Sequence, residues 1–171
     1  DNRELIALWP NFKENIYGAA IDIGSTTIAI NLCNLMDGSI VSNQGSMNPQ
    51  IRFGEDLMSR VSYCMLNPGS EKELTKTVRN AINELIEKAC IDAGLTQDEI
   101  LEITIVGNPV MHHMFLGFDP VPLGVSPFNL KTNKALYLKA SELDIQINSE
   151  KRDGNLRQYF YNFLHDKICD Y

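Results

Sequence analysis

The sequence predicts an α/β domain in which three antiparallel strands are followed by helices and a further strand. Two observations predict it. Three short segments rich in apolar and β-branched residues follow one another between residues 18 and 46, separated by tight turns. A long segment after Ser70 then repeats apolar residues at helical spacing, and a new β-rich segment follows at 103–106.

The first three strands form a predicted meander. Residues 18–24 (GAAIDIG) are small and apolar enough for a buried strand, and residues 27–35 (TIAINLCNL) continue with β-branched side chains. Asp37 and Gly38 predict a tight turn, after which residues 39–46 return as the third strand.

Two helices are predicted next. Asn48-Pro49 ends the sheet, and residues 55–65 carry apolar side chains at helical spacing. Residues 70–73 (SEKE) have the pattern of a capping box, and Gly94 supplies a left-handed end to the long helix that follows. The apolar stripe of this long helix consists of Leu74, Val78, Ala81, Ile82, Leu85, Ile86, Ala89 and Ala93.

A second capping box at 96–99 (TQDE) predicts a short helical turn before the strand at 103–106. Asn108 can cap a short helix with Pro109 in its first turn and Gly117 at its end. The resulting order β-β-β-α-(α)-β is that of the ribonuclease-H-like lobe, which actin-type ATPases use twice per molecule.

The chain divides into three predicted parts. Residues 1–15 are a linker remnant, residues 16–148 form the ribonuclease-H-like middle region, and residues 149–171 are an atypical C-terminal tail. Within the middle region, 135–138 and 144–147 have strand-like composition. The tail is predicted to be helical, because one helical face is offered by Leu156, Tyr159 or Phe160, Phe163 or Leu164, and Ile168.

Composition excludes several functional classes. The chain has 171 residues and a formal net charge of −7, which argues against nucleic acid or an anionic membrane as the main partner. No apolar run approaches the ~20 residues of a membrane span, and residues 1–15 lack the pattern of a signal peptide. We therefore expect a cytoplasmic protein.

The four cysteines, Cys33, Cys64, Cys90 and Cys169, lie far apart and form no CxxC pair. Iron–sulfur and zinc sites usually draw ligands from close sequence pairs, so we expect reduced thiols and no cluster in this chain.

The turn between the first two strands is the strongest candidate binding site. Residues 22–27 (DIGSTT) offer backbone N–H groups and three hydroxyls, from Ser25, Thr26 and Thr27, and Gly24 lets the backbone approach a phosphate closely. Asp22 can hold Mg²⁺ through water. The alternative is a plain hairpin turn, since these residue types are common in turns.

A charged group surrounds Gly54. Glu55 is the candidate catalytic residue, because Glu55 or Asp56 could reach a metal-bound water, and Arg52 could face a phosphate or a partner. The alternative for the whole group, Arg60 included, is a solvated helix N-terminus, where acidic side chains suit the helix dipole.

Gly107 and Asn108 follow the fourth predicted strand and are candidates for contact with the nucleotide, although a helix cap explains Asn108 equally well. The adjacent His112 and His113 point about 100° apart on a helix, so a shared metal is not expected.

Several blocks resemble one family in the order in which they occur. Residues 17–34 resemble the first phosphate motif of the acetate and sugar kinase/Hsp70/actin superfamily. The blocks NPQIRFGEDLMSRV (48–61), VGNPVMHHMFLG (106–117) and LGVSPF (123–128) resemble the ATP-dependent reductive activators of corrinoid proteins. The resemblance covers about residues 16–148.

This resemblance implies a larger protein with an N-terminal [2Fe-2S] ferredoxin domain and a C-terminal domain that completes the ATPase. ATP, with Mg²⁺, would then drive the reduction of Co(II) to Co(I) in a corrinoid iron–sulfur protein or another corrinoid protein. The present sequence contains neither ferredoxin cysteines nor a second phosphate motif, so we expect it to bind no cofactor tightly and to be inactive alone. The alternative functions are a small-molecule kinase of the same superfamily and a non-catalytic assembly module. A second copy of the chain, forming a homodimer, is a further candidate partner.

Overall fold

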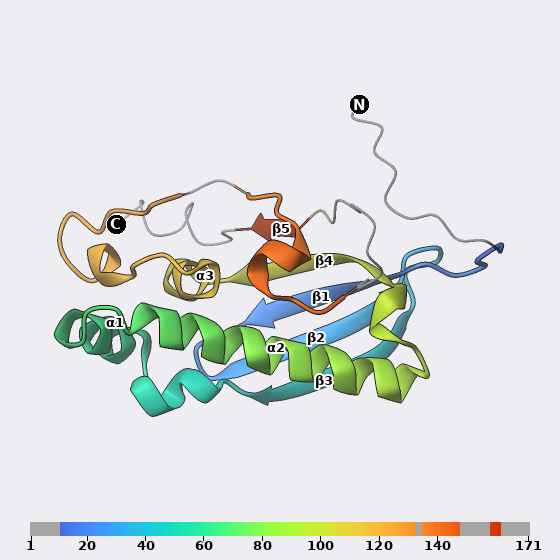
Figure 1. Cartoon of the computed structure of the whole chain (residues 1–171), viewed down its shortest axis with the longest axis horizontal. Coiled ribbons are helices and arrows are strands. Elements are labelled where there is room, and N and C mark those ends of the chain that lie inside the picture. The colour runs from blue at the N-terminus through green and yellow to red at the C-terminus, as the bar shows by residue number, and fades with distance from the viewer. Residues whose placement is uncertain (1–10, 133–134, 148–157, 162–171) are drawn as a thin grey trace.

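The computed structural model describes residues 11–132, 135–147 and, for the backbone, 158–161 (Figure 1). One mixed sheet runs through it in the order β3-β2-β1-β4-β5. Its strands are β1 (Tyr17–Ile23), β2 (Thr27–Asn34), β3 (Ile40–Met47), β4 (Ile100–Gly107) and β5 (Gln158–Tyr161).

The pairing of the strands confirms the predicted fold class. β1 pairs with β2 and β2 pairs with β3 in antiparallel fashion, as the meander required. β4 returns beside β1 as a parallel strand after the helices, and β5 extends the sheet beyond β4, also parallel. Three antiparallel strands followed by helices and a parallel strand next to the first form the ribonuclease-H-like lobe.

Three α-helices accompany the sheet: α1 (Leu57–Leu66), α2 (Glu71–Ala93) and α3 (Pro109–Leu116). α2 crosses one face of the sheet, whereas α1 and α3 lie near the end at which β1 and β4 finish (Figure 1). Short 3₁₀ helices complete the described part of the chain: η1 (Pro49–Phe53), η2 (Gln97–Glu99), η3 (Val121–Leu123) and η4 (Ala140–Leu143). None of the described helices is long and apolar enough to cross a membrane.

The core lies between the sheet and α2. Along β1, Ile21 and Ile23 are buried while Ala20 and Asp22 are exposed, which is the two-residue alternation of a sheet covered on one face. The predicted stripe of α2 supplies the opposite side of this core, and all of its members except the half-buried Ala93 are buried. Removal of this apolar area from water is the main driving force for folding.

The predicted helix ends are mostly confirmed. Gly94 ends α2 with φ 67°, and Asn108 caps α3 by accepting a hydrogen bond from the N–H of Met111 at 2.9 Å. The capping box of Thr96 and Glu99 is present. The box predicted at Ser70 is wrong: Ser70 has helical backbone angles and its hydroxyl makes no capping bond. A capping residue normally has extended backbone angles, which direct its side chain toward the N–H groups of the first turn. Because Ser70 has helical angles, its hydroxyl is not placed to accept from them.

Three other predictions fail on described residues. Residues 135–138 and 144–147 are not strands, because the intervening η4 turns the chain and Asp144 ends it with φ 54°. Within the tail, Gln158–Tyr161 form β5 rather than a helix. Hydrogen bonding to the edge of β4 favours an extended segment there, and a helical spacing of side chains carries no information about such a partner. Residues 1–10 and the rest of the tail lie outside the described residues.

Candidate phosphate-binding turn

The turn between β1 and β2, residues 24–27, is here called the phosphate turn. It is closed by a hydrogen bond from the N–H of Gly24 to the carbonyl of Thr27 at 3.0 Å. A Cβ on Gly24 would lie 2.6 Å from that same carbonyl oxygen. Only glycine therefore fits this position, for a steric reason that the sequence motif alone did not reveal.

The carbonyl groups of the turn are held from the protein side. The side chain of Asn48 donates to the Gly24 carbonyl at 2.9 Å, and the backbone N–H of Asn48 donates to the Thr26 carbonyl at 2.7 Å. The Ser25 carbonyl accepts a hydrogen bond from the guanidinium of Arg60 at 2.6 Å. Asn48 and Arg60 are both fully buried, so the Gly24 and Ser25 carbonyls point into the protein.

This arrangement fixes the direction of two N–H groups. In a planar trans peptide the N–H points opposite to the carbonyl of the preceding residue. Because the carbonyls of Gly24 and Ser25 point inward, the N–H groups of Ser25 and Thr26 point outward. Within the described chain, neither N–H has an acceptor. Two adjacent outward N–H groups in a turn form a concave site for an anion such as phosphate.

Asp22 lies next to this turn on the exposed face of the sheet. It pairs with Ala29 of β2 and Val106 of β4, and its side chain is exposed. A single exposed carboxylate beside several hydroxyls is the kind of donor set that suits a hydrated Mg²⁺. The described residues contain no group of three or more His, Cys, Asp or Glu side chains that could hold a metal ion.

Gly107, the last residue of β4, lies at the same end of the sheet as the phosphate turn. It pairs with Ile23, the residue before Gly24, and a Cβ on Gly107 would lie 3.1 Å from the Ile23 carbonyl. The structure thus brings Gly107 close to the phosphate turn. The side-chain oxygen of Asn108 is occupied by its capping bond to Met111, so only its remaining groups are available to a ligand.

The four charged residues around Gly54, which are Arg52, Glu55, Asp56 and Arg60, have different surroundings. Arg52 is exposed and pairs with Glu73 at 3.3 Å, and Asp56 caps α1 by accepting from the N–H of Ser59 at 2.7 Å. That hydrogen bond lowers the pKa of Asp56. Glu55 is exposed in front of α1. The interpretation as a solvated helix end is wrong for Arg60, which is buried.

Sequence reasoning missed the residues that support the turn: Asn48, Gln50 and Arg60. Asn48 was interpreted only as the end of the sheet. Arg60, however, lies three residues after Leu57 and four before Cys64, which places it on the apolar side of α1. A cation at that position is the signal that could have identified it, since buried arginine requires specific partners.

His113, the second histidine of α3, has a hydrogen-bond partner at each of its two ring nitrogens. His113 donates from Nδ1 to the Pro109 carbonyl at 2.8 Å, and its Nε2 accepts from the N–H of Lys131 at 3.0 Å. Both ring nitrogens are therefore occupied. The hydrogen bonds attach the segment around Lys131 to α3, which is a structural role.

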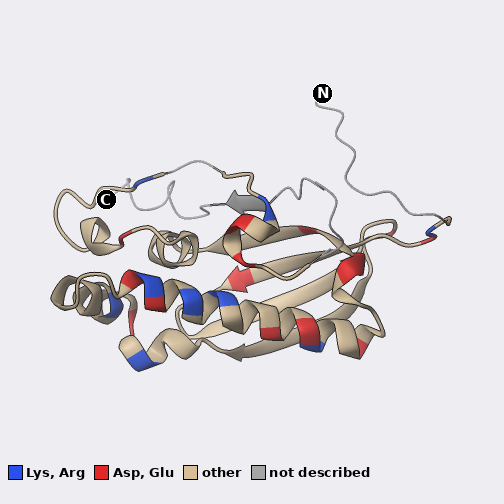
Figure 2. Cartoon of the chain, viewed as in Figure 1, with Lys and Arg blue, Asp and Glu red and all other residues tan. Residues whose placement is uncertain are grey.

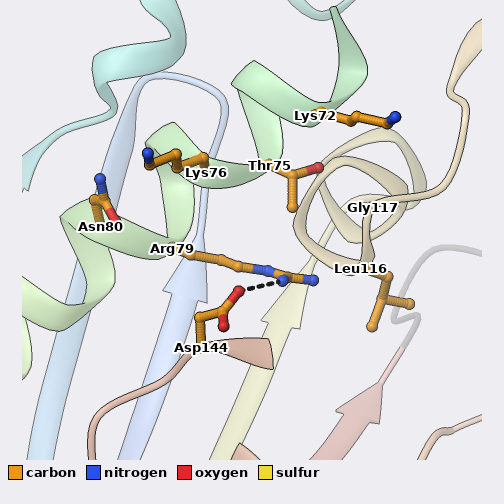
Figure 3. A pocket seen from close by; sticks show the side chains of 8 residues that line it. All are labelled: Lys72, Thr75, Lys76, Arg79, Asn80, Leu116, Gly117 and Asp144. Carbon is orange, nitrogen blue, oxygen red and sulfur yellow. Dashed lines mark hydrogen bonds and ion pairs between the residues drawn. The ribbon is translucent and has the colours of Figure 1, made fainter. Parts of the chain in front are cut away.

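A separate cavity of about 610 Å³ lies between α2, the end of α3 and Asp144 (Figure 3). Lys72, Lys76 and Arg79 follow one another along the N-terminal half of α2 (Figure 2) and give the cavity a basic wall. Arg79 is held in place, because its Nε donates to the Phe115 carbonyl at 3.0 Å and its guanidinium pairs with Asp144 at 3.2 Å. The cavity shares none of these residues with the phosphate turn.

Comparisons with known proteins agree on one family. The family model described as RACo middle region matches residues 17–153. The corrinoid activation enzyme RamQ of Eubacterium limosum is 32% identical over 148 residues, covering 86% of this chain and 25% of that protein. A solved structure described as a reductive activator for corrinoid, iron-sulfur protein superposes with a TM-score of 0.80 at 32% identity, covering 88% of this chain and 23% of its own.

The chain thus spans about a quarter of the length of these relatives. Because the family model covers the chain from β1 through α3 and beyond, and the solved relative has the same fold over that region, this chain belongs to the RACo middle region family.

Proposed function

We propose that this chain is the first nucleotide-binding lobe of an ATP-dependent, iron–sulfur reductive activator that returns a Co(II) corrinoid protein to Co(I). The observation that carries the proposal is the pair of outward N–H groups at Ser25 and Thr26, in a chain of the RACo middle region family. The complete activator binds ATP and Mg²⁺, carries its [2Fe-2S] cluster in another domain, and acts on its corrinoid protein in the cytoplasm.

The residues of this lobe divide the binding of the phosphates among them. The N–H groups of Ser25 and Thr26 donate to phosphate oxygens, and the hydroxyls of Ser25, Thr26 and Thr27 add further donors. Asp22 would hold Mg²⁺ through water, and the bound metal would neutralise part of the phosphate charge. Gly107 leaves room for the ligand beside β4. Glu55 is the candidate for positioning a water, because its carboxylate is exposed near the start of α1.

This lobe supplies only part of an ATP site, because adenine recognition and the opposite phosphate contacts require a second lobe. A phosphate held by one turn lacks the enclosing donors that position a water and stabilise developing charge. We therefore expect ATP binding by the 171-residue chain alone to be weaker than about 1 mM, or about 4 kcal/mol. Titration calorimetry with MgATP and a phosphate-release assay test this; saturable micromolar binding contradicts it.

The decisive experiment replaces Asp22 by Asn and Thr26 by Val in the longer protein that contains this lobe. Loss of a charge-assisted contact costs roughly 1.5–3 kcal/mol, so ATP affinity or turnover falls at least about tenfold in each variant. Matched controls are Asp37→Asn, in the turn between β2 and β3, and Thr104→Val, on the same exposed face of the sheet but in β4. Unchanged ATPase in both site variants means that the turn has no role in phosphate binding.

A further inference from the structure

Arg60 is a buried cation directly behind the phosphate turn. Its guanidinium donates from NH2 to the Ser25 carbonyl at 2.6 Å and from Nε to the Gly54 carbonyl at 2.9 Å. The remaining nitrogen lies 3.5 Å from the side-chain oxygen of Gln50 and 3.4 Å from the sulfur of Met111. The side chain is 0% exposed, so every one of these contacts is inside the protein.

All four acceptors of this guanidinium are neutral. Among the described residues, no carboxylate forms an ion pair with Arg60, although three other ion pairs are present. Burial lowers the pKa of Arg60, and the charge of Asp56 opposes this shift. The Asp56 side chain is exposed, however, and already caps α1 by accepting from the N–H of Ser59. A buried charge without a direct counter-ion is costly, so Arg60 depends on its hydrogen bonds to these neutral acceptors.

The geometry gives this charge an effect at the turn. The Ser25 carbonyl and the outward N–H of Thr26 belong to the same peptide group. By binding the carbonyl oxygen, the guanidinium holds this group in the orientation that an anion requires. Two hydrogen bonds and the peptide group between them separate the charge from an anion in front of the turn, which is a distance of roughly 8 Å. At that range, through a protein interior, a unit charge still attracts an anion appreciably.

We propose that Arg60 is a positioning residue of the phosphate turn: it orients the Ser25–Thr26 peptide and supplies a fixed positive charge behind it, so that the turn favours the more highly charged phosphate chains. This inference rests on the proposed function, because it assumes that the outward N–H groups bind phosphate. It gives Arg60 a role different from that of the exposed charged residues around Gly54, with which the sequence had grouped it.

The test follows the amide signals of Ser25 and Thr26 by NMR in the 171-residue chain, a method that measures millimolar affinities. The ligands are inorganic phosphate, pyrophosphate and tripolyphosphate as sodium salts, with a chelator to remove divalent metals. The variants are Arg60→Gln, which keeps a donor without the charge, and Arg60→Lys, which keeps the charge. Arg52→Gln is the matched control, because Arg52 is an exposed arginine eight positions earlier. Dispersed amide spectra establish that each variant is folded.

The expected result is a graded loss. In Arg60→Gln the affinity for tripolyphosphate falls at least about tenfold, and that for inorganic phosphate falls by a smaller factor, because the attraction scales with ligand charge. Arg60→Lys keeps the ranking of the three ligands at lower affinity, and Arg52→Gln matches the wild type. If Arg60→Gln does not fold, Arg60→Lys decides alone: loss of the ranking in that variant overturns the proposal.

Other outcomes separate the two hypotheses. If neither Ser25 nor Thr26 shifts with any ligand in the wild-type chain, the phosphate-binding function itself fails. If the wild-type chain binds but folded Arg60→Gln loses equal affinity for all three ligands, Arg60 only orients the peptide and the role of its charge is overturned. If folded Arg60→Gln binds like the wild type, the positioning role is overturned as well.

Discussion

Asn48 holds Gly24 in place across the end of the sheet: its side-chain nitrogen donates to the Gly24 carbonyl at 2.9 Å. The same residue donates its N–H to Thr26 at 2.7 Å and accepts from the N–H of Gln50 at 3.0 Å. One buried amide thus connects the phosphate turn to the start of η1. The shape of the turn therefore depends on a residue 24 positions away in the sequence.

Asn48→Ala is expected to destabilise the protein by about 1–3 kcal/mol, because it leaves the Gly24 carbonyl and the Gln50 N–H without their partner in a buried place. Urea denaturation measures the loss. Asn43→Ala is the matched control, since Asn43 is an exposed asparagine of the adjoining β3, and its loss should change stability by less than about 0.5 kcal/mol. Equal effects at the two positions would show that the buried amide is not a support of the turn.

Gly24→Ala is expected to disrupt the phosphate turn, because the new Cβ would lie 2.6 Å from the Thr27 carbonyl and the backbone would have to move. Overpacking of this kind typically costs about 1–3 kcal/mol. In Gly45→Ala of β3 the nearest atom would be 3.6 Å away, an ordinary contact, so this control should keep its stability. Thermal unfolding of the two variants, with amide spectra of Ser25 and Thr26, distinguishes them.

Much of the fold was predictable because its signals are local. The small apolar and β-branched segments of β1 and β2 and the apolar stripe of α2 are patterns of one element at a time, and Gly94 and Asn108 mark helix ends by their own conformations. Such features need no knowledge of distant partners. The parallel return of β4 beside β1 then follows from the order of the elements and the helical crossover between them.

The supports of the site were not predictable in the same way. Asn48 and Arg60 act on carbonyls 24 and 35 positions away, and a carbonyl has no residue-specific signal in a sequence. The DIGSTT motif located the turn but not the direction of its N–H groups, which depends on those distant bonds. Likewise β5 depends on the exposed edge of β4, which exists only once the sheet has formed.

Substitution of Arg79 is expected to destabilise the protein more than substitution of its ion-pair partner Asp144. The Arg79 side chain is 12% exposed and Asp144 is 86% exposed, so solvent screens the pair. Asp144→Asn should therefore cost less than about 1 kcal/mol. Arg79→Ala should cost about 1–3 kcal/mol, because it removes the donor to the buried Phe115 carbonyl and the packing over that ring. Urea denaturation of both variants checks this order, and equal losses would contradict it.

His112 is expected to make the protein less stable in mild acid. Burial, assisted by the charge of His113, lowers the pKa of His112 from 6.5 to about 4. Below pH 6.5 the unfolded chain therefore gains a proton that the folded chain does not bind, so stability is full above this value and declines as the pH falls toward 4.

Between pH 7 and pH 5.5 this linkage removes roughly 1 kcal/mol of unfolding free energy. Burial also lowers the pKa of His113, which adds to the loss in the same direction. Urea denaturation at the two pH values measures the change in the wild-type chain and in His112→Phe, a substitution that keeps an aromatic ring in the buried position. The variant should lose less stability on acidification than the wild type, because only His113 then contributes to the loss. The same pH dependence in both proteins would show that the pKa of His112 is equal in the folded and unfolded states.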